Sequence, residues 1–369
     1  MNSYHTAVAN VVSEVKEFFN KTFSEVNIDG PELNAKVLNQ NPLMLVSSHR
    51  SHADYFMLGS IFHLAGFNTL RFAAGDNLTK LPWIGPRFTS FGSFTVERDT
   101  GFDRHYVRNL CYRVVEMIEK GDTVLVFPEG GRSYSGAMLD IKTGILGASI
   151  ISQSKDPSRE VHYIPVTISY EYAPDIPWFS MQLTGKKWRK KSNFILKRLI
   201  GNLLYFGADA CSFIPFLLAQ YFCPKRYGAV YIDFAEPVAI NSLFDVNAGK
   251  IEKARDEFSS HRNNMQQLSA AVHKQLLELY RILPMHVVAA HLSVHRKATA
   301  AELSALFPST ISDLKAKGRN VKQLEKLTPE QNAVEGIRQL ARIKAIAHTK
   351  DTCTVRKKPL VDYYAATIA

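Results

Sequence analysis

Short apolar runs in the first 240 residues predict buried strands. Leu43–Ser47 and Thr123–Phe127 are the clearest, because each is a continuous apolar stretch bounded by polar or turn-forming residues. Runs rich in β-branched and aromatic residues predict further strands at residues 69–74, 91–98, 163–170 and 230–234. The segment from Gly75 to Pro86 contains many helix and strand breakers and is expected to be a loop.

Helical spacing of apolar residues appears between these strands. It predicts helices at Tyr55–Leu64, Tyr106–Lys120 and Gly144–Gln153. Strands that alternate with helices are typical of an α/β domain with a largely parallel sheet and flanking helices. Ligand sites in such domains lie at the carboxyl ends of the strands.

The two ends of the chain have a different pattern. Tyr4–Phe23 carries a helical apolar stripe, so residues 1–35 are expected to form an N-terminal helical segment before an α/β domain over residues 36–240. Residues 241–369 are expected to form a helical C-terminal region. Its predicted helices are Lys250–Phe258, Asn263–Tyr280, Pro284–Val294, Ala300–Phe307, Ile311–Lys317 and Ala333–Ala345.

The last three of these helices resemble a small helical subdomain, and its Lys and Arg content leaves a winged-helix or nucleic-acid role open. Aromatic residues interleaved for base stacking are absent there, so no nucleic-acid partner is expected. His286, His291 and His295 suggest a metal site, but the spacing lacks the Glu of a zinc-protease helix. We interpret them as ordinary helix residues and predict no metal.

The strand Leu43–Ser47 leads directly into a polar cluster, His49-Arg50-Ser51-His52-Ala53-Asp54. Two residues five positions apart on one helix project about 140° from each other and do not pair. His49 is therefore expected on the loop, with Asp54 in the first turn of the next helix, where the helix dipole favours an acidic residue. On its own the spacing also fits a polar helix cap.

Two more polar clusters follow later strands. Glu97-Arg98 ends one strand, and Pro128–Ser133 follows another. All three clusters fall at the carboxyl ends of predicted strands, and an ordinary distribution of surface polar residues would not prefer one edge of the sheet. This placement favours a functional site.

The chain resembles the glycerolipid acyltransferase family in four ordered motifs. They are His49–Asp54 (H-x-x-x-x-D), Gly92–Arg98, Phe127–Ser133 and Ile164–Val166. The pattern is most similar to bacterial glycerol-3-phosphate acyltransferases and their dihydroxyacetone-phosphate relatives, over roughly residues 36–240. The resemblance implies transfer of a fatty acyl group from an acyl thioester, carried by acyl-CoA or acyl carrier protein, to a hydroxyl of glycerol 3-phosphate. The product would be lysophosphatidate, and no cofactor is expected besides the acyl donor.

The resemblance also implies roles for individual residues. His49 would be the general base and Asp54 would fix its tautomer, while the substrate supplies the hydroxyl. Backbone amides near the loop or at Gly130-Gly131 would stabilise the oxyanion. The expected substrate-binding residues are Arg50, Ser51, Arg98, Glu129, Gly130, Gly131, Arg132 and Lys142.

One departure keeps the acceptor open. The glycerol-3-phosphate branch usually has two arginines at the end of its second motif, whereas Glu97 occupies the first of these places here. Lysophosphatidate, another lysophospholipid and dihydroxyacetone phosphate are therefore alternative acceptors. The alternative outside enzymes is a lipid- or nucleic-acid-binding protein that retains the fold.

Charge and composition favour an anionic partner. Lys and Arg outnumber Asp and Glu by 45 to 34, which leaves a formal charge of +11. Four scattered cysteines and an N-terminus without the pattern of a secretory signal favour a reducing, cytoplasmic location. Lys186–Arg226 combines a basic flank with an apolar stretch that Asp209 and Pro215 interrupt. We expect this segment to lie in the surface of an anionic membrane on its cytoplasmic face. The alternative is a helical hairpin buried inside the protein.

Overall fold

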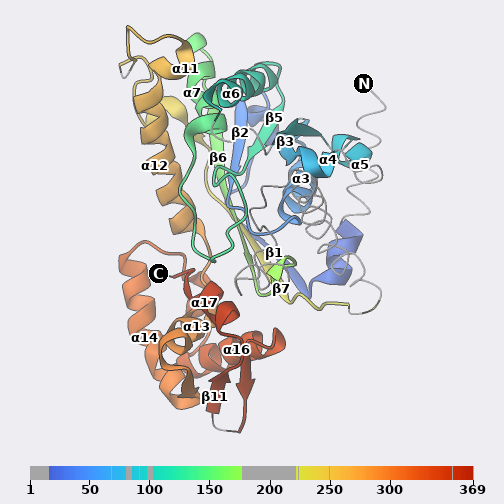
Figure 1. The fold of residues 1–369 in the computed structure, drawn as a ribbon, viewed down its shortest axis with the longest axis vertical. Coiled ribbons are helices and arrows are strands. Elements are labelled where there is room, and N and C mark those ends of the chain that lie inside the picture. The colour runs from blue at the N-terminus through green and yellow to red at the C-terminus, as the bar shows by residue number, and fades with distance from the viewer. Residues whose placement is uncertain are drawn as a thin grey trace, which may run out of the picture.

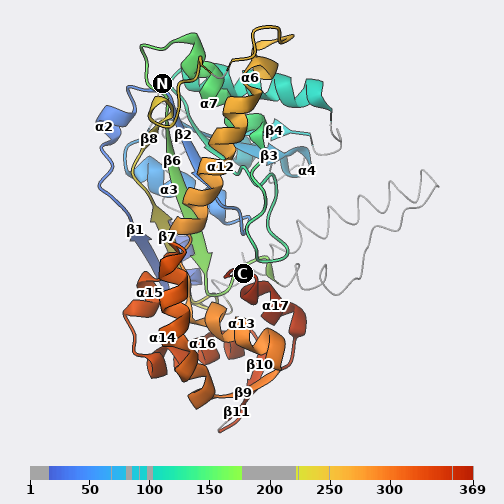
Figure 2. The same cartoon turned by 90° about the vertical axis from the view of Figure 1, so that its left-hand side faces the viewer.

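We analysed a computed structural model of the chain (Figures 1 and 2). It describes residues 16–67, 69–79, 85–90, 92–97, 103–176, 222, 224–248, 250–350 and 352–368. All statements about structure refer to these residues.

A mixed, mostly parallel sheet forms the centre of the larger part of the molecule (Figure 1). Its strand order is β1-β7-β6-β2-β5-β3-β4, and β8 pairs with β6. The strands are β1 (Glu25–Asp29), β2 (Leu43–Ser47), β3 (Leu70–Gly75), β4 (Ser93–Val96), β5 (Thr123–Val126), β6 (His162–Tyr170), β7 (Ala229–Phe234) and β8 (Val238–Ala239). Strands β6, β2, β5, β3 and β4 run parallel, whereas β7 is antiparallel to β6. The predicted α/β class with a largely parallel sheet is confirmed.

Helices cover both faces of this sheet because its inner strands are apolar on both sides. Along β2, Leu43 and Leu45 belong to one buried core, and Met44 and Val46 belong to the other. The helices of this part are α2 (Ala35–Leu38), α3 (Asp54–Leu64), α4 (Asp76–Thr79), α5 (Gly85–Ser90), α6 (Arg104–Glu119) and α7 (Thr143–Lys155). Helices α6 and α7 pack on the second core, while α3 packs on the first. Strand β2 therefore lies between two helical layers.

Two predictions about the first hundred residues need correction. Residues 25–29 form the strand β1, which pairs in parallel with β7, although we expected residues 1–35 to be helical. The alternation of Val26 and Ile28 with polar neighbours explains the strand, since a two-residue period places both on one face. The expected loop from Gly75 to Pro86 includes helix α4 and the start of α5. Of the helix predicted at Tyr4–Phe23, only residues 16–22 are described as helical, and residues 1–15 lie outside the description.

The C-terminal region is helical, as expected, but it also contains a small sheet. Its strands are β9 (Lys297–Thr299), β10 (Ile346–His348) and β11 (Thr352–Val355), in the antiparallel order β10-β11-β9. Its helical elements are η1 (Ile240–Ser242), α11 (Glu257–Ser260), α12 (Arg262–Leu279), α13 (Pro284–His295), α14 (Ala300–Ala316), α15 (Lys322–Glu325), α16 (Pro329–Arg342) and α17 (Lys358–Ala365). From α13 to β11 the sequence of elements is that of a winged helix.

Two helix predictions for this region were wrong. The predicted helix Lys250–Phe258 is reduced to the single turn α11, capped by the Asp256 side chain. The two helices predicted on either side of Pro308 are one helix, α14. A proline inside a helix removes one hydrogen bond, but Leu303, Phe307 and Leu314 are buried along α14, and their packing holds the helix together.

The C-terminal region lies beyond the carboxyl end of β6 (Figure 2). Buried Arg281, which follows α12, forms ion pairs with Asp233 of β7 and Asp29 of β1. No helix in the described part of the chain is long and apolar enough to cross a membrane. The predicted membrane segment Lys186–Arg226 lies almost entirely outside the described residues.

Candidate active site at the carboxyl edge of the sheet

The loop after β2 carries His49 toward the start of α3. Strand β2 hydrogen-bonds to β5 and β6 along its length, and the Ser48 amide donates to the Val166 carbonyl in the middle of β6. Asp54 is the first residue of α3, as predicted. The Nδ1 atom of His49 lies 2.8 Å from Oδ2 of Asp54. The expected arrangement, with His49 on the loop and Asp54 in the first helical turn, is present.

Asp54 is held by both side-chain and backbone donors. It is fully buried, and its Oδ2 atom also accepts the amides of Arg50, at 2.6 Å, and Ser51, at 2.9 Å. Its Oδ1 atom accepts the hydroxyl of Tyr170 at 2.6 Å. Because an ionised carboxylate only accepts hydrogen bonds, His49 must carry its proton on Nδ1.

This tautomer leaves Nε2 of His49 as an acceptor. His49 is 9% exposed, and its ring stacks on Phe127 with centroids 4.2 Å apart. Within the described residues no hydrogen-bond partner of Nε2 is present. A histidine whose second nitrogen is unprotonated and unpaired has the chemistry of a general base.

The neighbouring His52 is placed differently. Its ring is hydrogen-bonded through Nδ1 to the Tyr55 hydroxyl at 2.9 Å, and its backbone amide donates to Asp175. His52 is also buried deeper than His49. The two histidines therefore differ in their partners, since the His49 ring contacts Asp54 and the His52 ring contacts Tyr55. The sequence distinguished them only by their spacing from Asp54.

Glu129 joins the loop after β5 to the loop of His49. Its Oε1 atom accepts the His49 amide and its Oε2 atom accepts the Leu139 amide, both at 2.9 Å. The Ser133 amide in turn donates to the His49 carbonyl. Glu129 was expected to bind substrate, and its described contacts fix the geometry of the two loops.

Gly130 needs the freedom of glycine. Its φ is +73°, and a Cβ atom there would lie 2.6 Å from Nζ of Lys142. Lys142 is exposed and forms no ion pair with any described residue, so an unneutralised ammonium group lies against the Gly130 backbone. Gly131 has open space around its Cα, and its amide donates to no described residue.

The other residues expected to bind substrate are engaged inside the protein or are not described. Arg50 donates to the Ala137 carbonyl and lies 5.0 Å from the centre of the Tyr280 ring. Arg132 forms a buried ion pair with Asp175 at 3.2 Å. Ser51 is fully buried, and its hydroxyl accepts the Ala53 amide. Arg98 lies outside the described residues. Substrate binding by Arg50, Ser51, Arg98 and Arg132 stays a prediction.

The sequence analysis missed Tyr170 and Asp175 as parts of this site. Tyr170 ends β6, and Asp175 lies in the turn that follows. The three polar clusters were predicted from their position at the carboxyl ends of strands. Tyr170 and Asp175 lie at the carboxyl end of β6, so the same criterion would have identified them. No three His, Cys, Asp or Glu side chains in the described part of the chain are arranged to share a metal ion.

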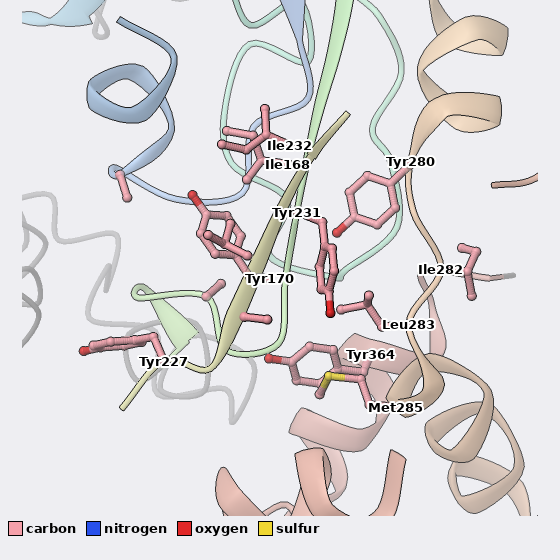
Figure 3. Packing of buried hydrophobic residues seen from close by; sticks show 14 of the residues in the cluster. Ile168, Tyr170, Tyr227, Tyr231, Ile232, Tyr280, Ile282, Leu283, Met285 and Tyr364 are labelled. Carbon is pink, nitrogen blue, oxygen red and sulfur yellow. The ribbon is translucent and has the colours of Figure 1, made fainter. Parts of the chain in front are cut away.

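The C-terminal region packs directly on this edge of the sheet. A Cβ atom at Gly136, where φ is +89°, would lie 1.8 Å from the Tyr363 carbonyl oxygen of α17. A small cavity between the two regions is lined by Arg50, Tyr170, Tyr280, His286 and Tyr363, among others. Figure 3 shows Tyr280, Tyr364 and Met285 gathered between the sheet and the C-terminal helices.

The chain is similar to known acyltransferases over most of the sheet. The profile of the Acyltransferase family matches residues 25–169, which include strands β1 to β5, all but the last residue of β6, and both catalytic candidates. The chain is therefore similar to this family over residues 25–169. The loops of His49–Asp54 and Phe127–Ser133 both lie in this range.

Curated relatives of the chain are named glycerol-3-phosphate acyltransferase. The protein of Actinobacillus pleuropneumoniae is 25% identical over 262 residues, which are 71% of this chain and 29% of that protein. The protein of Glaesserella parasuis is 28% identical over 241 residues, or 65% of this chain and 27% of that protein. The chain thus spans less than a third of the length of these relatives.

Among solved structures, the chain is similar to the 1-acyl-sn-glycerophosphate acyltransferase PlsC of Thermotoga maritima. The TM-score is 0.37 at 17% identity, over 74% of this chain and 83% of that one.

Proposed function

We propose that the chain is an O-acyltransferase that moves a fatty acyl group from an acyl thioester to a hydroxyl of glycerol 3-phosphate. The observation that carries the proposal is the His49–Asp54 pair at the carboxyl edge of the sheet. In this pair, Nε2 of His49 is free to accept a proton. The names of the curated relatives support the choice of reaction and acceptor.

The chemistry follows from this geometry. The acceptor hydroxyl gives its proton to Nε2 of His49 while its oxygen attacks the thioester carbonyl. The resulting imidazolium is stabilised by Asp54. The tetrahedral intermediate then expels the thiolate, which takes the proton from His49, so the ester and the free thiol are formed without a covalent enzyme intermediate. The open Gly131 amide is a candidate donor to the oxyanion.

We assign the phosphate of the acceptor to Lys142 and Arg98. Lys142 carries an unneutralised charge next to the Gly130 turn, and Arg98 follows β4, whose carboxyl end lies on the same edge of the sheet. Lysophosphatidate, another lysophospholipid and dihydroxyacetone phosphate remain the alternative acceptors, because Glu97 departs from the expected arginine. Acyl-CoA and acyl carrier protein are both candidate donors.

The test is an assay of the purified chain with acyl-CoA or acyl carrier protein and a panel of acceptors. The panel holds glycerol 3-phosphate, dihydroxyacetone phosphate and lysophosphatidate. We expect His49→Ala to lower turnover by roughly 10² or more with the fold intact, because it removes the base. His348→Ala, at an exposed histidine of the small C-terminal sheet, is the matched control.

Two results would contradict the proposal. One is a folded chain that releases no thiol with any acceptor, which would favour a binding protein that retains the fold. The other is near-normal turnover in His49→Ala together with a loss in His52→Ala, which would mean that the wrong histidine is assigned.

We further propose that the protein attaches to the cytoplasmic face of an anionic membrane through Lys186–Arg226. The basic flank and apolar stretch of this segment in the sequence support attachment without spanning. Replacing Lys187, Arg189, Lys190 and Lys191 by Gln is expected to abolish the preference for anionic vesicles in a flotation assay. Electrostatic attachment would be refuted if the unaltered chain and the variant floated to the same extent, with anionic vesicles as with neutral ones.

A further inference from the structure

We propose that Tyr170 is a positioning residue for the His49–Asp54 pair. Its hydroxyl holds Oδ1 of the Asp54 carboxylate, so that Oδ2 faces Nδ1 of His49. This inference rests on the proposed function, because it assigns Tyr170 to the same proton transfer.

Tyr170 is bonded to the Asp54 oxygen that the loop does not hold. The loop amides of Arg50 and Ser51 and the ring of His49 all reach Oδ2. The Tyr170 hydroxyl donates to Oδ1 at 2.6 Å and is the one described donor to that atom. Tyr170 lies 116 residues further along the chain, at the end of β6. The carboxylate is therefore fixed between two elements that the sheet holds side by side.

The phenol is itself held in place. Tyr170 is buried, its ring lies 5.9 Å from that of Phe23, and its hydroxyl points toward the segment that leads into α3 (Figure 3). The Met57 sulfur, at 3.6 Å, is a second acceptor for the same hydroxyl. A charged carboxylate is the stronger acceptor of the two, so the proton is donated to Asp54.

The hydroxyl stays a donor throughout the reaction. Burial, together with the neighbouring Asp54 carboxylate, raises the pKa of Tyr170 well above its usual value. Ionisation of the phenol would place a second negative charge against Asp54. Tyr170 therefore does not exchange its proton with the substrate and is not itself a base.

The bond also moderates the negative charge that His49 faces. A hydrogen bond to Oδ1 withdraws part of the carboxylate charge, so removing it strengthens the attraction between Asp54 and the imidazolium. His49 would then hold its proton at higher pH. The charged and titratable groups that face the Tyr170–Asp54 contact are His49, Arg50, Glu129, Asp175, Tyr280, His286 and Tyr363.

The test compares Tyr170→Phe with Tyr163→Phe on the same strand. Tyr163 is also a buried phenol, but it donates to Gln275 at 2.7 Å, away from the site. We expect Tyr170→Phe to lower kcat roughly tenfold with little change in KM, the size of one hydrogen bond to a charged group. The acid limb of its pH–rate profile is expected to move about half a unit to higher pH. Tyr163→Phe should leave the position of the acid limb unchanged.

A second measurement separates this inference from the proposed function. The protonation of His49 is followed by NMR of the imidazole in the unaltered chain and in both variants, which does not depend on turnover. A higher His49 pKa in Tyr170→Phe alone supports the inference even if no acceptor is acylated. An unchanged His49 pKa and an unchanged acid limb in a folded Tyr170→Phe protein would overturn it, whatever the activity of the unaltered chain.

Discussion

Tyr170 and Glu171 are neighbours at the end of β6, yet they serve two different regions. Tyr170 donates to Asp54 inside the α/β domain. Glu171 accepts from Gln339 at 3.1 Å and from Arg342 at 2.9 Å, both on α16 of the C-terminal region. Successive residues of a strand point to opposite sides, so one strand end supplies both contacts.

The carboxylate of Asp54, which Tyr170 contacts, and that of Glu171 differ in their partners. Asp54 is surrounded by hydrogen-bond donors, with the ionisable ring of His49 as its one described basic partner. Glu171 is paired with the permanent charge of Arg342, and burial nevertheless raises the pKa of Glu171. Burial of an acidic residue therefore does not by itself mark a catalytic site. The partner of the carboxylate determines whether the pair can act in catalysis, because only a group that can change its protonation can transfer a proton.

The comparison also explains the basic helices of the C-terminal region. Arg338 and Arg342 lie on α16, the helix that corresponds in element order to the recognition helix of a winged helix. Both lie within ion-pair distance of Glu171. Arg342 therefore pairs with the α/β domain, whereas Arg338 also pairs with Glu335 of its own helix.

The largest effect is expected at Asp54. Asp54→Asn is expected to lower turnover by roughly 10³, because an amide group that donates to Nδ1 of His49 stabilises the tautomer with its proton on Nε2. Steady-state kinetics with circular dichroism as a check of folding provides the measurement. Asp122→Asn, at a half-exposed carboxylate paired with Arg71, is the control. Equal losses in both variants would remove the distinction drawn for Asp54.

A smaller effect, on stability rather than rate, is expected at α16. Arg342→Ala should lower the free energy of unfolding by about 2 kcal/mol at pH 8, because it leaves the buried Glu171 without its main counter-charge. Glu171→Gln should change it by less than about 1 kcal/mol, since the cost of burying the charge disappears together with the ion pair. Urea unfolding of both variants provides the measurement.

The sign of the pH dependence follows from the raised pKa of Glu171. The folded protein binds this proton more tightly than the unfolded chain, so its contribution to stability is present below pH 4.5 and is lost as the pH rises. The deficit of Arg342→Ala relative to the unaltered chain should therefore be smaller at pH 4.5 than at pH 8. A deficit that grows toward low pH would show that Glu171 is not the group affected.

The third prediction concerns His286, which lies where the two regions meet. Burial, followed by the charges of Arg50 and Arg319, lowers the pKa of His286 to about 3. The unfolded chain binds this proton near pH 6.5, so the stabilising contribution is present above that pH and is lost as the pH falls toward 3. At pH 5 the loss amounts to about 2 kcal/mol.

Urea unfolding at pH 5 and pH 7.5 checks this prediction. His286→Asn keeps an acceptor for the Leu283 amide, which His286 binds through Nδ1, but removes the titrating ring. Its loss of stability between the two pH values should be smaller than that of the unaltered chain by about 2 kcal/mol. His348→Asn, at an exposed position, should behave like the unaltered chain, and an identical loss in all three proteins would contradict the assignment.

Local pattern was enough to predict most of the elements around the site. The strand Leu43–Ser47 was found with the bounds that the structure has, because a continuous apolar run between polar residues has few other stable forms. Helical geometry placed His49 on the loop and Asp54 in the first turn of α3, and the resemblance in four ordered motifs favoured their pairing over a polar helix cap. The strand β1 and the small sheet β10-β11-β9 were missed, since short strands gain their stability from partners that lie far away in the sequence.

Local pattern was sufficient to predict the parallel strands β2 to β6 and the edge of the sheet on which the polar clusters lie. The atoms that each polar residue contacts depend on the tertiary structure. Ser51, Arg50 and Arg132 have the sequence signature of ligand-binding residues, yet their described partners are Ala53, Ala137 and Asp175. The contact of Tyr170 with Asp54 joins residues 116 positions apart. A periodic pattern reports only which side of an element is buried, whereas a hydrogen bond needs two atoms within about 3 Å, and that depends on how distant elements pack.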